Sequence, residues 1–148
     1  MQTVRSIYDD RVGDDLRHDE AQEAIIARLD ALAADLREAS GVLSRLKSRR
    51  KAPRGVYSWG GVGRGKSMLV DMFLASVGDL SVRRTHFHAF MRDIHRALHK
   101  ARAAGSDDPV VLAADHVNKG LTLLALDELE ITDIVDAMIV GRVFARMF

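Results

Sequence analysis

Cysteine and long apolar runs are both missing from this sequence. Without a cysteine among its 148 residues, the chain cannot form disulfide bonds or use thiolate chemistry, which suits a reducing compartment. No apolar run approaches the roughly 18 residues of a membrane-spanning helix. The N-terminal stretch MQTVRSIYDDRVGDD has no apolar core and contains four aspartates, unlike a secretory signal or a transit peptide. We therefore expect a cytoplasmic protein with no membrane span.

A strong excess of one charge is missing as well. Lys and Arg together number 22 against 21 Asp and Glu, so no broad positive field draws the chain onto nucleic acid or anionic lipid. Hydrophobic residues make up 47% of the chain, which at this length is enough for one sizeable core. The composition predicts a globular protein with no nucleic-acid partner.

The first third of the chain has the pattern of an amphipathic helix. Asp19 is expected to cap this helix, with Gln22 as its capping-box partner. Ser40 and Gly41 interrupt the apolar stripe, so packing against the chain's own core is favoured over a coiled coil. We predict a helical segment with a basic linker over residues 1–50 and a second domain over 51–148. The stripe consists of Ile25, Leu29, Leu32, Leu36, Ala39, Leu43 and Leu46.

The stretch SWGGVGRGKSML carries the clearest functional pattern in the chain. Residues 55–59 are expected to form a short strand and the residues after Ser67 a helix, so that the glycine-rich loop joins the two. Its residues fit the pattern G-x-x-x-x-G-K-[ST], and a mobile glycine loop is the less favoured interpretation. The predicted nucleotide-binding residues are Gly60, Gly61, Val62, Gly63, Arg64, Gly65, Lys66 and Ser67.

The glycines and the lysine of this loop serve one physical purpose. Backbone N–H groups have to turn inward around a phosphate chain, which requires positive φ angles and a close approach that side chains would block. Lys66 is expected to reach the β and γ phosphates as a catalytic point charge. Ser67 is expected to offer its hydroxyl to Mg²⁺.

A second motif, LTLLALDE, supplies the carboxylates that such a site needs. Its apolar residues predict a buried parallel strand, and Asp127 and Glu128 follow at the carboxyl end, where open α/β sheets bind ligands. Asp127 is expected to hold Mg²⁺ through its water shell, and Glu128 to polarise the attacking water. The alternative is that this acidic pair caps the helix beginning near Thr132.

The two motifs also discriminate between classes of nucleotide-binding protein. A guanine-specific GTPase is expected to contain Asn-Lys-x-Asp, and Asn118-Lys119-Gly120-Leu121 lacks the aspartate. A small-molecule kinase remains possible because kinases share the phosphate loop. The adjacent Asp-Glu pair favours ATP hydrolysis.

Four of the six histidines lie in residues 83–104, between the two motifs. THFHAF, residues 85–90, is expected to form a strand with His86 and His88 on one face, and His95 and His99 are spaced i and i+4 on the helix that follows. A zinc site is disfavoured because no cysteine is present and Asp93 lies on another helix face. Histidines in the core or on the surface are the better interpretation.

Three stretches of the chain together resemble one family. PRGVYSWGGVGRGKSMLVDMF, THFHAFMRDIHRALH and LLALDELEITDIVDAMIVGRVFARMF closely resemble the ZapE family of P-loop ATPases, and the resemblance runs from about Asp19 onward. It implies an α/β fold of the AAA+-like P-loop type, a three-layer α/β/α arrangement with a parallel sheet, present here as an incomplete N-terminal fragment. In that family Gly60 to Ser67 would be the Walker A loop, and Asp127 with Glu128 the Walker B motif.

The resemblance also implies a function. It indicates an ATPase that uses ATP and Mg²⁺ to act on a protein partner, an FtsZ-like division protein in bacteria, and that forms a homo-oligomer when full length. Family members usually have Phe-Asp-Glu-Phe where this chain has Leu126-Asp127-Glu128-Leu129, which changes the packing and keeps both carboxylates. Because the family's arginine finger lies outside this chain, we expect weak hydrolysis by the chain alone. A non-catalytic nucleotide-binding or interaction module is the alternative.

Overall fold

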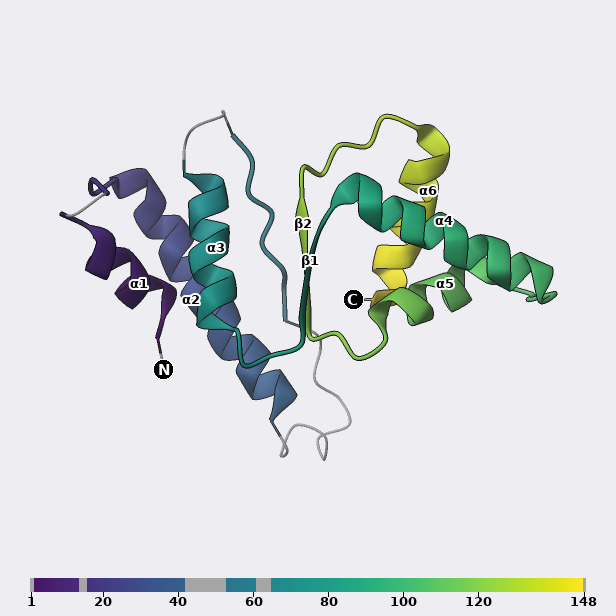
Figure 1. Ribbon diagram of the computed structural model, residues 1–148, viewed down its shortest axis with the longest axis horizontal. Helices are drawn as coiled ribbons and strands as arrows, with labels where there is room; N and C mark the ends of the chain where they lie inside the picture. The colour runs from purple at the N-terminus through teal and green to yellow at the C-terminus, as the bar shows by residue number, and fades with distance from the viewer. Residues whose placement is uncertain (1, 14–15, 42–52, 61–64, 148) are drawn as a thin grey trace. The chain divides into compact units, whose positions relative to one another are not determined.

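The computed structural model describes residues 2–13, 16–41, 53–60 and 65–147. The chain divides into two compact units, Met1–Leu80 and Ser81–Phe148. Figure 1 shows the first unit with helices α1 to α3 and the second with strands β1 and β2 and helices α4 to α6. The boundary expected near residue 50 lies outside the described residues. The elements are α1 (Val4–Arg11), α2 (Glu20–Ser40), α3 (Lys66–Ser76), β1 (Val82–His86), α4 (Phe87–Ala103), α5 (Pro109–Asn118), β2 (Leu123–Asp127) and α6 (Ile134–Met147).

Helix α1 is held against α2 by polar contacts at its start. The Asp30 carboxylate on α2 accepts hydrogen bonds from the backbone N–H groups of Val4 (2.7 Å) and Arg5 (3.2 Å). Two of the N–H groups that an isolated helix leaves unsatisfied are thereby bonded. The Arg5 guanidinium also pairs with Glu23 on α2. These contacts fix α1 on the N-terminal half of α2.

Helix α2 forms where the apolar stripe predicts it, and its cap differs in one detail. The Asp19 side chain accepts a hydrogen bond from the Ala21 N–H at 2.9 Å, as expected of an N-cap. The Asp19 N–H, which a capping-box partner would accept, instead donates to the Tyr8 hydroxyl at 3.1 Å. The expected capping-box role of Gln22 is therefore wrong, because Tyr8 of α1 takes that position.

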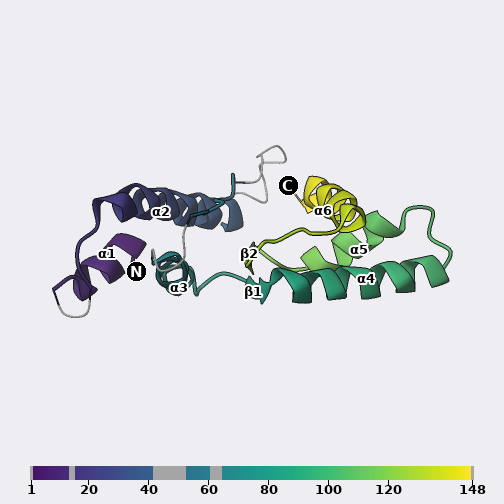
Figure 2. The same ribbon diagram turned by 90° about the horizontal axis from the view of Figure 1, so that it is seen from above.

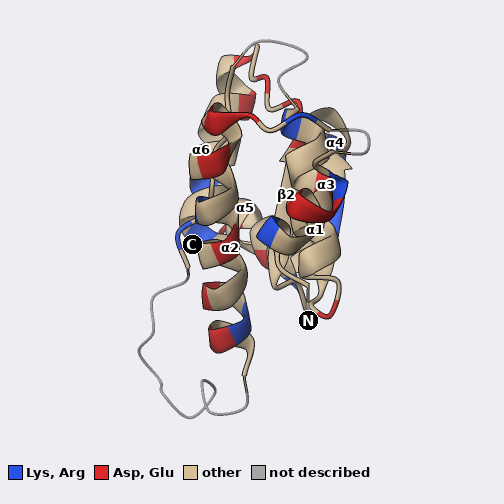
Figure 3. Cartoon of the chain, turned by 90° about the vertical axis from the view of Figure 1, so that its left-hand side faces the viewer, with Lys and Arg blue, Asp and Glu red and all other residues tan. Residues whose placement is uncertain are grey.

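Most of the predicted α2 stripe is buried within the first unit. Leu29, Leu32 and Leu36 are at most 6% exposed, so packing within the chain explains the stripe. Leu43 and Leu46 lie outside the described residues. Charged residues of both signs alternate along the rest of α2 (Figure 3).

Helix α3 lies beside α2 and supplies the other half of this core. Leu69, Met72 and Phe73 are each at most 5% exposed. At the other end of α3, Arg37 of α2 donates a hydrogen bond to the Ser76 carbonyl and pairs with Asp79 at 3.2 Å. A cation at a helix C-terminus satisfies a carbonyl that has no partner within the helix. Helix α3 is thus anchored along its face and at its C-terminal end.

The strand expected at residues 55–59 does not form. This stretch is extended, and Tyr57 and Trp59 are 68% and 82% exposed. Together with Ala24, Ile25 and neighbouring α2 residues it lines a pocket of about 340 Å³. A strand needs a partner ladder, and the described part of the first unit contains only helices. The aromatic, β-branched composition was therefore a misleading signal here.

The second unit contains a parallel pair of strands. Val82 of β1 lies opposite Leu123 of β2, and the pairing continues to His86 opposite Asp127. Parallel neighbours need a long crossover connection, which α4 and α5 provide. The predicted α/β class with a parallel sheet is confirmed, with two strands among the described residues.

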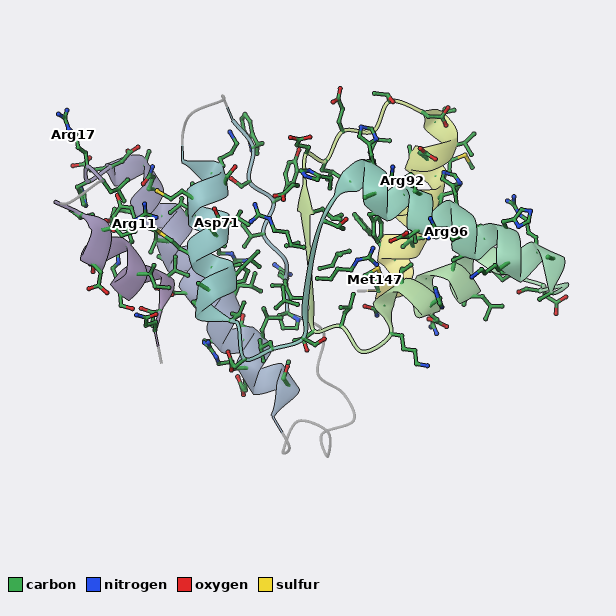
Figure 4. All side chains as sticks on the ribbon, in the orientation of Figure 1. Arg11, Arg17, Asp71, Arg92, Arg96 and Met147 are labelled. Atoms are coloured by element: carbon green, nitrogen blue, oxygen red, sulfur yellow. The ribbon has the colours of Figure 1, made fainter. Side chains whose placement is uncertain are left out.

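Helices α4, α5 and α6 bury the core of the second unit. Helix α5 packs against both α4 and α6, as Figures 1 and 2 show together. Leu124 and Leu126 of β2 pack against this core, so the other β2 side chains lie on the opposite sheet face. Arg92 and Arg96, one turn apart on α4, are exposed (Figure 4). The buried core residues are Phe87, Phe90, Met91, Ile94, Ala97, Leu98, Ala113, Ala114, Val117, Val140 and Val143.

Helix α6 is tied to α5 by two ion pairs. Arg142 pairs with Asp108 at 2.6 Å, and Arg146 pairs with Asp115 at 2.8 Å. The hydrogen bond from Arg146 lowers the pKa of the Asp115 carboxyl. Among the described residues, no helix combines the length and the apolar character needed to cross a membrane.

Candidate functional site

The glycine-rich loop ends at the N-terminus of α3. Gly65 has a φ of 73° and is the N-cap residue of α3, and Gly60 has a φ of 141°. Both angles lie in the region that side chains disfavour, so glycine is required there for conformational reasons. The predicted residues Gly61, Val62, Gly63 and Arg64 lie outside the described residues.

Lys66 is the first residue of α3, and its side chain contacts the first residue of the glycine-rich loop. Its Nζ donates a hydrogen bond to the Gly60 carbonyl at 2.8 Å. The lysine ammonium therefore lies near the residue at which the loop begins, six positions earlier in the sequence. Ser67 is exposed in the first turn of the same helix. Gly60, Gly65, Lys66 and Ser67, which we call the loop half of the candidate site, are thus gathered around one helix N-terminus, where backbone N–H groups and the helix dipole favour anions.

Gln22 packs against the loop half, and sequence reasoning missed this contact. A Cβ added at Gly65 would lie 2.8 Å from the Gln22 Nε2, which is too close for any real side chain. Gln22 is 7% exposed, so its amide group lies buried beside the loop. Gly65 is therefore required for its φ angle, and a side chain there would also displace the Gln22 amide. The signal in the sequence was an uncharged polar residue on the buried stripe of α2.

The two predicted carboxylates lie at the carboxyl end of β2. Asp127 is the last residue of the strand, and its side chain is 26% exposed on the sheet face opposite the α4–α6 core. Glu128 follows directly and is 80% exposed. We call Arg84, His86, Asp127 and Glu128 the strand half of the candidate site. The loop half belongs to the first unit and the strand half to the second.

Glu128 has an unusual backbone conformation. Its φ of 54° is the only positive value among the described residues other than glycine. A non-glycine residue in this region costs of the order of 1–3 kcal/mol, and such residues cluster at functional sites. The conformation turns the chain at the end of β2, and the Glu128 carboxylate lies 4.0 Å from the His86 Nδ1.

Arg84 binds the Asp127 carboxylate with two donors. Its Nε lies 2.7 Å from Oδ2 and its Nη2 lies 3.3 Å from Oδ1. Arg84 is opposite Ala125 in the ladder, so both members of the pair lie on the same sheet face. Sequence reasoning missed this contact because it placed the strand too late, beginning at Thr85.

The alternative role for the acidic pair, as a helix cap, is taken by another residue. Helix α6 begins at Ile134, and the Asp133 side chain accepts hydrogen bonds from the N–H groups of Val135 (2.7 Å) and Asp136 (3.2 Å). Asp133 is therefore the cap of α6, and Asp127 and Glu128 lie well before it. The helix-cap interpretation of this pair is wrong.

The four histidines are distributed differently from the prediction. Strand β1 ends at His86 and α4 begins at Phe87, so His88 lies on a helix and does not share a strand face with His86. The reason is that the helical apolar spacing already begins at Phe87. His95 bonds to Asp136 of α6 at 2.7 Å. In the part of the chain that the structure describes, no group of three metal-ligating side chains is present.

The two predicted magnesium ligands, Ser67 and Asp127, lie in different units, and each has the donor chemistry that this ion prefers. Mg²⁺ prefers hard oxygen ligands and usually keeps several waters, so it needs only one or two protein oxygens. Ser67 offers a hydroxyl and Asp127 a carboxylate, which are ligands of this kind. Both Asp127 oxygens are already bonded to Arg84, so Mg²⁺ would have to share or replace that contact.

Comparison with protein families gives a match over almost the whole chain. The family described as AFG1-like ATPase matches residues 3–148. The chain belongs to this family.

Curated relatives in this family are longer than the chain. Cell division protein ZapE of Escherichia coli (strain K12) is 32% identical over 145 residues, covering 88% of this chain and 38% of the relative. Lactation elevated protein 1 homolog B of Danio rerio is 34% identical over 110 residues, covering 68% of this chain and 22% of the relative. The chain thus spans well under half the length of these relatives. No solved structure matches the chain.

Proposed function

We propose that this chain is the nucleotide-binding part of an ATPase that hydrolyses ATP with Mg²⁺ and acts on a protein partner. The observation that carries the proposal is the start of α3, where Gly65 caps the helix and Lys66 reaches back to the Gly60 carbonyl. A lysine in the first turn of a helix supports phosphate binding, because the helix N–H groups and the ammonium both favour anions. Membership of the AFG1-like ATPase family supports the same conclusion.

In this proposal each residue of the loop half has a separate role. The backbone N–H groups of Gly60 to Ser67 bind the phosphates, and Lys66 exchanges its contact with Gly60 for the β and γ phosphates. The Ser67 hydroxyl is a ligand for Mg²⁺. When bound, Mg²⁺ would supply neutralisation of the charge that develops on the phosphate oxygens.

The strand half completes the reaction. Asp127 would hold Mg²⁺ through its water shell, and Glu128 orients the attacking water and accepts its proton. Glu128 is suited to this because it is exposed and extends from a sharp turn at the strand end. General-base catalysis of this kind contributes about 10²–10⁴-fold to a rate.

The partner and the setting come from the family. The name of the Escherichia coli relative describes it as a cell division protein. We therefore propose an FtsZ-like division protein as the partner of the full-length protein, a cytoplasmic location, and a homo-oligomer as its working form. No nucleic-acid partner is proposed because positive and negative charges are balanced.

Calorimetry with ATP and Mg²⁺ on the wild type and on Lys66→Ala tests the proposal. We expect binding by the wild type and at least a tenfold weaker affinity in Lys66→Ala, since removing a charge-assisted hydrogen bond costs about 1.5–3 kcal/mol. Lys100→Ala, an exposed lysine on α4, is the matched control and is expected to bind like the wild type. Equal affinity in all three proteins would end the proposal.

Phosphate release separates the ATPase from the alternative, a non-catalytic nucleotide-binding or interaction module. Binding that depends on Lys66 without any turnover supports the module. Turnover that depends on Lys66 supports the ATPase.

A further inference from the structure

The contact between Arg84 and Asp127 is the feature of the strand half that the proposed function does not use. The guanidinium binds both carboxylate oxygens, at 2.7 and 3.3 Å. Two-pronged pairs of this kind are stronger and more specific in geometry than single contacts. The Asp127 carboxylate is therefore already occupied by a cation of the chain itself.

The pair lies at the surface, and its geometry is set by the two strands. The side chains of Arg84 and Asp127 are 34% and 26% exposed, so solvent reaches both only in part. They extend from neighbouring strands on one face, at positions that the ladder register fixes. The short Asp127 side chain is held in place by its strand, so forming the pair mainly requires ordering the Arg84 side chain.

The neighbouring arginine on β1 has a different partner. Arg83 lies on the other sheet face and pairs with Asp93 of α4. Arg83 thus fastens the strand to its covering helix, while Arg84 binds a carboxylate at the site. Two adjacent arginines of one strand provide a matched pair for an experiment.

We propose that Arg84 is an internal counter-ion that occupies Asp127 until Mg²⁺ arrives with the nucleotide. This inference rests on the proposed function. One carboxylate group cannot give its best geometry to a guanidinium and a divalent ion together, and the two cations repel each other. Arg84 therefore keeps the nucleotide-free protein from binding free Mg²⁺ and yields only when phosphates add ligands for the ion.

The test measures metal binding without nucleotide. Mn²⁺, as a stand-in for Mg²⁺ that electron paramagnetic resonance detects, is titrated into the wild type, Arg84→Gln and Arg83→Gln. We expect Mn²⁺ to bind Arg84→Gln on the order of tenfold more tightly, as follows from removing one charge about 5 Å from a divalent ion in a water-like dielectric. Arg83→Gln is expected to bind like the wild type. Asp127→Asn added to Arg84→Gln is expected to abolish the gain.

A purely structural role for Arg84 gives a different result. If the pair only joins the two strands, Arg84→Gln lowers the melting temperature and leaves Mn²⁺ affinity unchanged or weaker, which overturns the proposal. Should Arg84→Gln fail to fold, the Arg84 Nε–H signal of the wild type is followed by ¹⁵N NMR. Loss of its bonded shift on adding ATP with Mg²⁺ supports the proposal, and an unchanged shift at saturation overturns it.

The same measurements keep this inference apart from the proposed function. Nucleotide binding that depends on Lys66, combined with unchanged Mn²⁺ affinity in Arg84→Gln, overturns the counter-ion alone. Nucleotide binding that does not depend on Lys66 overturns the proposed function and the inference with it.

Discussion

The loop half and the strand half of the candidate site differ in the residue type that adopts positive φ angles. In the loop half the positive φ angles fall on glycines, Gly60 and Gly65, which adopt them without strain. In the strand half the positive φ falls on Glu128, where it costs conformational free energy. The difference indicates that the loop half depends on its backbone groups, whereas the strand half depends on the side chain of Glu128.

Replacing Glu128 tests the strand half, and the effect on turnover is the largest we expect. Glu128→Gln keeps the shape and removes the base, so phosphate release falls about 10²–10⁴-fold while ATP binding is retained. Glu128→Gly loses turnover to a similar extent and also relieves the φ of 54°, which stabilises the fold by about 1 kcal/mol. Phosphate-release assays and urea denaturation measure the two effects.

The two variants act as controls for each other. Glu128→Gln retains the strained backbone, so its free energy of unfolding is expected to match the wild type. The comparison between the halves breaks down if Glu128→Gly is less stable than Glu128→Gln, or if either variant hydrolyses ATP at the wild-type rate.

Adding a Cβ to the loop half gives the next largest effect. Gly65 and Gly120 have nearly the same φ, 73° and 75°, and differ in their surroundings. At Gly120 a Cβ would meet nothing within 4 Å, so Gly120→Ala is expected to cost only the conformational strain of about 1–2 kcal/mol. Gly65→Ala adds a clash with Gln22 and is expected to cost more and to weaken ATP binding. Urea denaturation and calorimetry measure both, and equal stability losses would show that the Gln22 contact is not a constraint.

The smallest expected effect concerns the first turn of α2, which carries Gln22. The pKa of Glu23 is lowered from 4.5 to about 2, and the largest cause is its hydrogen bond from Arg5. Because this pKa is lower in the folded than in the unfolded chain, the ion pair stabilises the fold at pH values above the unfolded-state pKa. This stabilisation is lost as the pH falls toward 2. Glu23→Gln is therefore expected to melt slightly below the wild type at pH 7, with the difference disappearing between pH 4.5 and 2.

Thermal melts across that pH range make the measurement. Glu20→Gln, in the same helical turn, corrects for the loss of one negative charge. A difference that persists at pH 2 would assign it to packing rather than to the ion pair.

The motifs could be placed from the sequence because each depends on local chemistry. A glycine-rich loop before a helix and an acidic pair after an apolar strand are each visible in consecutive residues, and the neighbouring elements, helix α3 and strand β2, formed as expected. The strand at residues 55–59 was wrong because strand formation depends on a partner that local composition does not reveal.

Contacts between distant residues were beyond sequence reasoning for a related reason. The Arg84–Asp127 pair depends on the ladder register, and a shift of three residues in the expected start of β1 moved Arg84 out of the strand altogether. The Gln22–Gly65 contact depends on how α2 packs beside α3. Neither contact can be predicted from the spacing of residues within one helix or strand.

Trp59 offers a practical advantage for studying this protein. It is the chain's single tryptophan, 82% exposed, and it directly precedes Gly60. An indole in water is sensitive to quenchers and to changes of polarity, so its fluorescence reports on the phosphate loop without an attached dye. Nucleotide titrations, stopped-flow kinetics and quenching by acrylamide can all use this one native chromophore.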